Sequence, residues 1–311
     1  VAIGASLKSG STERYFDGLI DEVVVFRDIL TTGEIDQIRQ GTYAAASPTT
    51  TTTTLPPATT TTTTLPGGTT TTTLPPAGND FSVDGNARAL WRVDNGALTT
   101  DSIGTNTLTD NNTVGTDTVD YQAGDASADF GMSNSESLTI TDANLDSGFP
   151  LKSGESNGDF SVTFWFKLKS LNNSAALFSK WDTGTSARSV LLRDNNGRLE
   201  FFIGTNSGPG YELLSNSLST SIGRWYHLGA TFNNTTKAWQ IRVYEDGGSA
   251  TTYSGTATNN ISITSAPFSI GAAYNNGSPI YHIDGLMDEV VVFADVLTIG
   301  EIDQIRQGTY A

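Results

Sequence analysis

Residues 283–293 read IDGLMDEVVVF, and nearly the same letters, FDGLIDEVVVF, stand at residues 16–26. The match extends over residues 1–44 and 268–311, which align without a gap at an offset of 267 and are identical at about two thirds of the positions. Self-similarity at a fixed period is typical of repeat architectures. The offset leaves room for a whole domain and a linker. The sequence therefore predicts one complete repeat preceded by the end of another.

A helix signal follows each copy of this segment. Thr298 and Glu301 have the Ser/Thr-x-x-Glu spacing of a capping box. Ile302 and Ile305 then fall on one helical face, and Gly308 is placed to end the helix. The earlier copy repeats this pattern, so each repeat is expected to end in a short helix.

The part of the chain between the two copies has the pattern of short strands. Runs rich in β-branched and aromatic residues alternate with turn clusters of Asn, Gly, Asp and Pro, which is typical of an antiparallel sandwich or jelly roll. The predicted strands are Phe160–Leu168, Ser189–Arg193, Leu199–Ile203, Trp225–Phe232, Trp239–Tyr244 and Gly285–Phe293. The predicted fold class is all-β, with the short C-terminal helix laid against the sandwich.

Composition divides the chain into three regions. Residues 1–46 are predicted to be the C-terminal part of a preceding repeat, residues 47–79 a Thr/Pro-rich low-complexity linker, and residues 80–311 a complete domain. The linker offers too little apolar area to build a core, and its proline and threonine favour extended backbone, so we expect a semi-stiff spacer.

Threonine runs in the linker have the composition of O-glycosylated stalks, with a bare tether as the alternative. The predicted glycosylation sites are Thr49, Thr50, Thr51, Thr52, Thr53, Thr54, Thr59, Thr60, Thr61, Thr62, Thr63, Thr64, Thr69, Thr70, Thr71, Thr72 and Thr73.

The bulk composition excludes several classes of function. The formal net charge is −16, which is too acidic for a nucleic-acid partner, since such proteins need basic patches. There is no cysteine for disulfide or thiolate chemistry. No apolar run reaches the roughly 18 residues that a membrane span needs. Because Val1 lies within a segment that matches the end of a domain, we expect that the chain is cut or processed from a longer precursor.

Several motifs together resemble laminin-G-like (concanavalin-A-like) domains. The closing segment with its capped helix resembles that family's ending, and residues 101–104 (DSIG) resemble its early turn. Residues 160–166 (FSVTFWF) look like its central aromatic strand, and residues 224–228 (RWYHL) like its Trp-x-His strand. The resemblance implies a β-sandwich over residues 80–311. It says less about function, because this sandwich hosts lectins, adhesins, hydrolases and scaffolds.

Calcium is a cofactor that the resemblance implies, since such domains often hold one structural Ca²⁺ at the edge of the sandwich through carboxylate and backbone oxygens. The matching positions are Asp288 and Asp101, with Asp94 and Asp284 as further candidates. The alternative is that Asp284 only makes a turn and Asp288 bonds local backbone amides.

Catalytic constellations are not found in the sequence. Glycoside hydrolases on similar sandwiches carry closely spaced carboxylates on one strand, and no such run exists here. His282 is replaced by Tyr15 in the first copy, so we expect it to be structural, and His227 fits a strand residue better than a base. We therefore predict a protein that is not an enzyme.

The sequence predicts one function and leaves one alternative. The first is a structural extracellular or cell-surface protein, the repeat unit of a head-to-tail fibre or stalk whose partner is a further copy of itself. The second is a carbohydrate-binding adhesin or lectin that gains avidity from its repeats, with glycans as partners. Aromatic residues that would stack on sugars are Trp181, Tyr211, Tyr253 and Tyr274. Those expected in the core instead are Phe164, Phe166, Phe201, Trp225 and Trp239.

Overall fold

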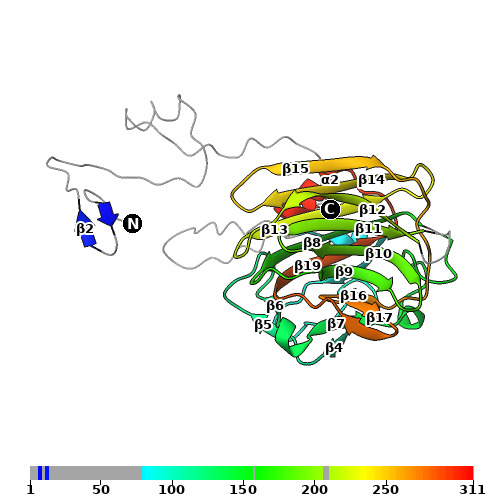
Figure 1. The fold of residues 1–311 in the computed structure, drawn as a ribbon, viewed down its shortest axis with the longest axis horizontal. Coiled ribbons are helices and arrows are strands. Elements are labelled where there is room, and N and C mark those ends of the chain that lie inside the picture. Colours follow the sequence, from blue (N-terminus) through cyan, green and yellow to red (C-terminus); the bar gives the residue numbers. More distant parts are fainter. Residues whose placement is uncertain (1–5, 9–10, 14–78, 157, 206–209, 311) are drawn as a thin grey trace, which may run out of the picture. The chain divides into compact units, whose positions relative to one another are not determined.

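A computed structural model describes residues 6–8, 11–13, 79–156, 158–205 and 210–310. The chain divides into two units, with the boundary between Thr71 and Thr72. The threonines predicted to carry glycans, and most of the predicted fragment over residues 1–46, lie outside the described residues. Figure 1 shows the second unit as a stack of long strands.

In the first unit the described residues form a hairpin of β1 (Ser6–Lys8) and β2 (Ser11–Glu13), with Ser6 opposite Glu13. At the offset of 267, these strands correspond to β17 (Ala273–Asn275) and β18 (Ser278–Ile280) of the second unit. There Ala273 lies opposite Ile280, which is the same register. The two sequence copies therefore form the same hairpin.

One sheet of the second unit has nine strands in the order β12-β11-β10-β9-β16-β7-β4, with β17 beside β9 and β18 beside β17. The pairs are antiparallel, except that β17 meets β9 in a parallel bridge. Its other strands are β4 (Thr109–Asn111), β7 (Ser137–Ile140), β9 (Ala175–Asp182), β10 (Ala187–Asp194), β11 (Arg198–Gly204), β12 (Tyr211–Ser219) and β16 (Phe268–Ile270).

The second sheet has eight strands in the order β15-β14-β13-β8-β19-β6-β5, with β3 also paired to β19. Its strands are β3 (Ala87–Trp91), β5 (Gly115–Asp117), β6 (Ser127–Phe130), β8 (Phe160–Leu168), β13 (Trp225–Phe232), β14 (Ala238–Glu245), β15 (Ala250–Thr256) and β19 (Gly285–Phe293). Three short 3₁₀ helices lie in the connections, at Phe81–Val83, Met132–Asn134 and Asp142–Asn144.

Aromatic side chains from both sheets fill the space between them. Trp91 of β3 stacks on Phe268 of β16 with ring centroids 4.9 Å apart, and Phe178 of β9 meets the same ring edge-on at 5.1 Å. Phe164 of β8 stacks in turn on Phe178 at 6.4 Å. Burying this apolar area is the main stabilising term of the sandwich. The predicted all-β sandwich is confirmed, and each of the six predicted strands lies within a strand of the structure.

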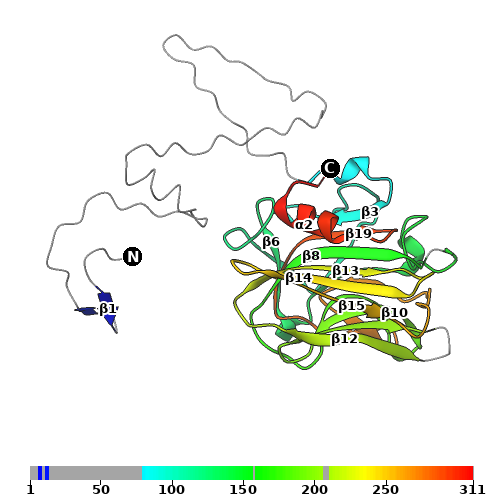
Figure 2. The same cartoon turned by 90° about the horizontal axis from the view of Figure 1, so that it is seen from above.

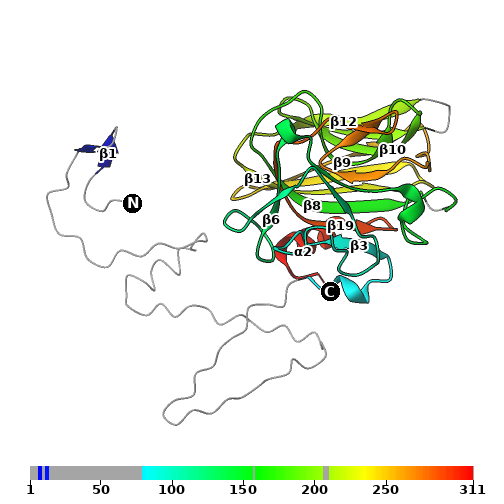
Figure 3. The ribbon, with the colours of Figure 1, turned by 90° about the horizontal axis from the view of Figure 1, so that it is seen from below.

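Helix α2 (Ile299–Gln307) covers the outer face of the eight-stranded sheet, as Figures 2 and 3 show from opposite sides. The predicted capping box is present at Thr298, and Gly308 ends the helix with φ of 69°. Ile302 packs so closely on β13 that a Cβ on Gly229 would lie 2.5 Å from its Cγ2 atom. None of the helices in the described part of the chain is long and apolar enough to cross a membrane.

Candidate functional site

A pocket of about 130 Å³ opens on the outer face of the nine-stranded sheet. Four neighbouring strands, β9 to β12, and the segment after β18 contribute to it. Its lining residues are Trp181, Thr183, Arg188, Leu191, Arg193, Phe202, Tyr211 and Tyr281. We call this the aromatic pocket.

Strand alternation explains why the apolar side chains of this pocket are separate from the main core. On β10, Val190 and Leu192 point into the sandwich core, so Leu191 between them points outward. Leu191 lies opposite Phe202 of β11 in the antiparallel register, which places both side chains on the same outer face. The β10–β11 pair therefore forms the apolar floor of the aromatic pocket.

Three aromatic rings converge at this floor. The ring centroid of Trp181 is 6.0 Å from that of Tyr211 and 6.3 Å from that of Phe202, and the Phe202 and Tyr211 centroids are 5.7 Å apart. Trp181 and Phe202 are only 3% and 7% exposed, whereas Tyr211 is 59% exposed. Tyr211 is thus the ring that the pocket presents to solvent, and the other two rings support it.

Two guanidinium groups lie over these rings. The central carbon of the Arg188 guanidinium is 5.7 Å from the ring centroids of both Trp181 and Tyr211. That of Arg193 is 4.8 Å from the Phe202 centroid and 5.9 Å from the Tyr281 centroid. Cation–π contacts of this kind hold a cation and a ring in a defined arrangement.

Hydrogen bonds fix both arginine side chains in place. Arg188 donates from Nη2 to the carbonyl oxygen of Thr183 at 2.9 Å. Arg193 donates from Nε to Glu200 at 2.7 Å, across the β10–β11 pair. The polar groups of the aromatic pocket are therefore held in position by the sheet that carries them.

Asp182, at the end of β9, supports one wall of the aromatic pocket. Its carboxylate accepts hydrogen bonds from the backbone N–H groups of Gly184, Thr185, Asn276 and Gly277. Burial alone would raise the pKa of this carboxyl, but the four backbone donors outweigh it and hold the pKa below its usual range. The ionised Asp182 thus ties the tip of the β17–β18 hairpin to the strand that carries Trp181.

A larger polar pocket of about 530 Å³ adjoins the turn between β10 and β11. It is lined by Asn173, Asn195, Asn196, Gly197, Arg198, Glu200 and Ser219. Glu200 lines this pocket and pairs with Arg193, which lines the aromatic pocket, so the ion pair stands between the two.

The four aspartates predicted to bind calcium have different surroundings. Asp101 is buried, and its two carboxylate oxygens accept five hydrogen bonds, from the backbone N–H groups of Leu90, Ile103, Gly104 and Asn106 and from the Asn106 side chain. These donors organise the early turn around the carboxylate, and they leave few lone pairs for a metal ion.

Asp288 on β19 is fully buried. Its Oδ2 accepts from the backbone N–H groups of Gln122 and Ala123 at 2.7 and 2.8 Å. Among the described residues, its Oδ1 has no hydrogen-bond partner. Burial raises the pKa of Asp288 to about 7, against its usual value of 3.8.

Asp94 and Asp284 complete the predicted set. Asp94 accepts from the backbone N–H of Asp125 at 2.9 Å, and the backbone oxygen of Asp284 accepts from Lys169 N–H. Within the described ranges, no three or more His, Cys, Asp or Glu side chains gather as a metal-binding group. The four aspartates therefore do not form one such group. Calcium binding stays a prediction, which thermal unfolding with calcium and with a chelator tests.

Both histidines have structural surroundings. His227 on β13 is 2% exposed and meets Trp165 edge-on at 5.0 Å. Burial, reinforced by the nearby charge of Arg306, lowers its pKa to about 3, so the ring is neutral at physiological pH. The His282 Nδ1 atom lies 3.2 Å from the backbone oxygen of Glu136.

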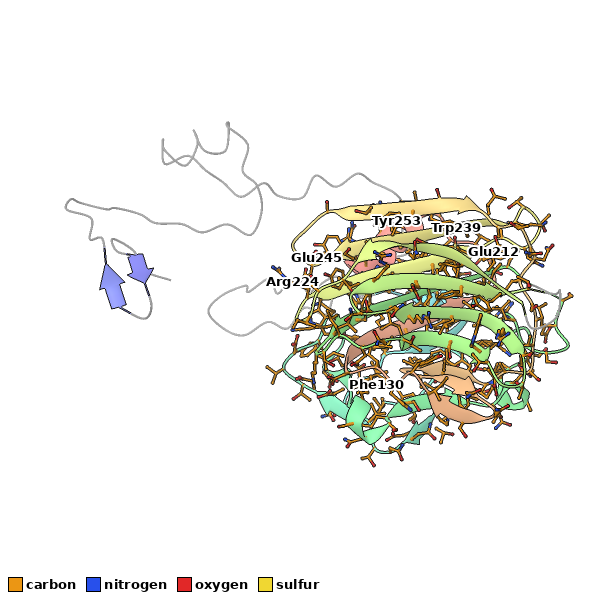
Figure 4. The ribbon with its side chains drawn as sticks, viewed as in Figure 1. Phe130, Glu212, Arg224, Trp239, Glu245 and Tyr253 are labelled. Atoms are coloured by element: carbon orange, nitrogen blue, oxygen red, sulfur yellow. The ribbon has the colours of Figure 1, made fainter. Side chains whose placement is uncertain are left out.

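The aromatic residues predicted to stack on sugars are not all available for it. Trp181 and Tyr211 meet in the aromatic pocket, but Tyr274 is only 8% exposed. Tyr253 is half-buried on the edge strand β15, apart from the pocket, where Figure 4 labels it near Trp239. The sequence analysis missed Arg188, Arg193, Phe202 and Tyr281, because no local pattern marks them as neighbours of Trp181 and Tyr211.

Comparisons with known proteins agree with this architecture. A protein-family model described as the concanavalin A-like lectin/glucanases superfamily (Laminin_G_3) matches residues 133–303, more than half of the chain. The chain belongs to this superfamily. A search of curated protein sequences finds no match.

Solved structures show the same fold. Domain 4 of AbnA, an extracellular arabinanase from Geobacillus stearothermophilus, in complex with arabinotriose, is 21% identical with a TM-score of 0.50; the match covers 71% of this chain and 98% of that one. The binding domain of botulinum neurotoxin serotype D is 17% identical with a TM-score of 0.51, covering 72% of this chain and 52% of that one. At these identities the likeness shows the fold alone.

Proposed function

We propose that the sandwich domain is a non-catalytic glycan-binding module and that the aromatic pocket is its binding site. The observation that carries the proposal is the convergence of three rings and two fixed arginines in one pocket. Small-molecule sites combine such an apolar lining with a few well-placed polar groups. A sugar ring would lie against the exposed face of Tyr211, and its hydroxyls would accept hydrogen bonds from the guanidinium groups.

The comparisons support this proposal at the level of fold. The superfamily is named for lectins as well as glucanases, and the arabinanase domain was solved in complex with arabinotriose. The described residues that line the aromatic pocket include no Asp or Glu, whereas glycoside hydrolysis uses a pair of carboxylates flanking the bond. We therefore propose binding without cleavage, outside the cell or at its surface.

A glycan array probed with the full chain tests the proposal. The variant Tyr211→Ala removes the exposed ring, and Tyr253→Ala is the matched control, because Tyr253 is a tyrosine on an edge strand outside the pocket. Loss of an aromatic anchor typically costs more than 1 kcal/mol, so we expect Tyr211→Ala to weaken binding by about tenfold. Tyr253→Ala should leave affinity unchanged. Equal effects of the two variants would contradict the assignment of the site.

A structural role is the second candidate, and the shared hairpin of the two units favours it. Because β1–β2 has the register of β17–β18, we propose that residues 1–46 are the end of another repeat. In the complete domain the strand that follows this hairpin, β19, pairs with β3, β6 and β8. The earlier copy would need equivalent partners, from a preceding repeat or from a second chain in a head-to-tail assembly.

Sedimentation of the full chain over a range of concentrations tests this second candidate. We expect association that is lost when residues 1–46 are deleted. A full chain that stays monomeric throughout would rule out assembly between chains. O-glycosylation of the seventeen linker threonines is part of the same proposal, as a stiffener of the spacer. Intact mass before and after chemical deglycosylation measures it, and an unchanged mass would reduce the linker to a plain tether.

A further inference from the structure

We infer that the aromatic pocket selects glycans carrying an anionic group, a carboxylate or a sulfate, which Arg193 binds with support from Arg188. This inference rests on the proposed glycan-binding function and adds the chemical class of the ligand. The combination that carries it is a cationic, aromatic-lined pocket on a strongly acidic protein.

The charge of the aromatic pocket is opposite to that of the chain. The protein has 17 Lys and Arg residues against 33 Asp and Glu residues, so its net charge of −16 repels anions. Among the described residues lining the pocket, two are arginines and none is acidic. A pocket with this local charge favours an anionic ligand over a neutral one of the same shape.

Two acidic residues that adjoin pocket residues in the sequence use their carboxylates for hydrogen bonds to other groups. The carboxylate of Asp182 accepts hydrogen bonds from four backbone N–H groups. Glu212 follows Tyr211 on β12. Its carboxylate accepts hydrogen bonds from the backbone N–H groups of Thr258 and Asn259 and from the Asn259 side chain. Figure 4 shows Glu212 near the edge strands of the sandwich. Neither carboxylate pairs with an arginine of the pocket.

Glu200 engages Arg193 of the pocket directly, and it does so in a way that leaves donors of Arg193 available. Arg193 donates from Nε to Glu200 at 2.7 Å. Among the described residues, no hydrogen bond engages its terminal nitrogens. Guanidinium nitrogens bind carboxylates and other oxyanions in a bidentate manner, and the Phe202 ring 4.8 Å below limits water on one side, which strengthens the interaction. Glu200 thus orients Arg193 without using all of its donors.

An array of glycan pairs tests the inference, with each sialylated, uronic-acid-containing or sulfated glycan printed beside its neutral parent. We expect the full chain to bind the anionic member of at least one pair about tenfold more tightly. Titration of the best pair by calorimetry then gives the affinities, and the anionic group that responds shows whether carboxylate or sulfate is the ligand. The preference should weaken as salt is raised, because ion pairing is screened.

Three variants separate the pocket from the general charge of the protein. Arg193→Gln should bring the anionic glycan to within about twofold of its neutral parent, whereas Arg193→Lys keeps the charge and the pair with Glu200 and should retain part of the preference. Arg224→Gln removes the same charge from an exposed side chain outside the pocket and should change nothing. Circular dichroism shows whether each variant folds. If Arg193→Gln does not fold, Arg193→Lys tests the role of Arg193 instead. A preference for the anionic glycan equal to that of the unmodified chain would then overturn the role of the guanidinium group.

The outcomes distinguish the inference from the proposed function. Equal affinity for anionic and neutral members of every pair, with both lost in Tyr211→Ala, would overturn the anionic preference and leave glycan binding intact. An equal effect of Arg224→Gln and Arg193→Gln would show long-range charge instead of a site, and would also overturn the inference. Binding to no glycan at all would overturn both proposals.

Discussion

Asp288 is a carboxyl group that the fold holds in an environment poorly suited to its charge. It is fully buried on β19, one of its oxygens has no hydrogen-bond partner among the described residues, and its pKa is raised to about 7. Asp101, which is also buried, differs because five donors satisfy its oxygens. The two buried acids thus differ in the number of donors that surround their oxygens.

The raised pKa of Asp288 predicts a pH dependence of stability. Between about pH 4 and 7 the unfolded chain ionises this group while the folded protein keeps it protonated, so its contribution to stability is present at low pH and lost as pH rises through 7. A shift of about 3 units corresponds to roughly 4 kcal/mol at most. Asp288→Asn can still accept hydrogen bonds from Gln122 and Ala123 but does not titrate.

Urea unfolding of the unmodified protein and Asp288→Asn at pH 5 and pH 8 measures this effect. We expect the variant to gain unfolding free energy relative to the unmodified protein as pH rises. His227 titrates in both proteins, so its contribution cancels in the comparison. The charge of the neighbouring Glu289 helps to raise the pKa of Asp288, so the difference between the two proteins reports this pair of carboxyl groups together. Parallel pH profiles would show that Asp288 is ionised in the folded protein over this range.

Helix α2 shows how one element depends on a single position of another. Its apolar face, with Ile302 and Ile305, packs on the outer face of the eight-stranded sheet. The residues that it clusters with are Leu90, Val291 and Phe293 of the sheet and Phe81 of the first 3₁₀ helix. The approach to β13 is close because Gly229 has no side chain. Arg242 of β14 also holds the helix, through two hydrogen bonds to Asp303 at 3.2 and 2.7 Å.

The close approach predicts that Gly229→Ala destabilises the domain. The added Cβ would lie 2.5 Å from Ile302, so the helix must shift or the side chain must leave its position. Overpacking of this kind typically costs about 1–3 kcal/mol in unfolding free energy. Gly85→Ala is the control, because a Cβ there meets nothing within 4 Å. Chemical denaturation compares the two, and similar stabilities would mean that the helix adjusts without cost.

The two ends of the sandwich domain are joined by one side chain. Asn79, where the described part of the domain begins, donates to both carboxylate oxygens of Glu289 at 3.2 and 3.3 Å and to the backbone oxygen of Ile305 at 2.8 Å. Its own side-chain oxygen accepts from Tyr310 N–H at 3.1 Å. The beginning of the domain, its central strand β19 and its final residues are thereby held together.

Removing this connection is expected to destabilise the whole domain. In the described part of the chain, Asn79→Ala leaves the buried Glu289 carboxylate with Arg92 alone, at 3.5 Å, and leaves Tyr310 N–H without its partner. The Ile305 backbone oxygen loses one of its two donors and keeps Gly308 N–H at 3.1 Å. Unsatisfied buried polar groups cost about 1–3 kcal/mol each, so we expect a loss of at least 2 kcal/mol. Asn86→Ala removes one exposed hydrogen bond to Asp295 and is the control. Equal melting temperatures for the two variants would show that the connection is dispensable.

The amino-acid sequence by itself determined the sandwich, six of its strands and the capped helix, but it did not indicate the buried strand β9. Phe160–Leu168 and Gly285–Phe293 coincide with β8 and β19, because segments rich in β-branched and aromatic residues and bounded by turns favour a strand. The Thr298 capping box is likewise a local pattern. The repeat can also be read directly, because its two copies match residue by residue. Short strands such as β4 and β5, which are largely exposed, lack such a pattern and were not predicted.

Only the tertiary structure decided which side chains form the aromatic pocket and which acids are buried. Trp181, Arg193 and Tyr211 lie on different strands, and they meet because the register of β9 to β12 places them on one face. A shift of one residue in that register would turn each side chain to the opposite face. The register depends on many long-range pairings along the sheet, whereas strand and helix patterns depend on neighbours in the sequence. For this reason the fold could be predicted from the sequence, whereas of the pocket the sequence offered only Trp181 and Tyr211 as candidates and did not show that they meet.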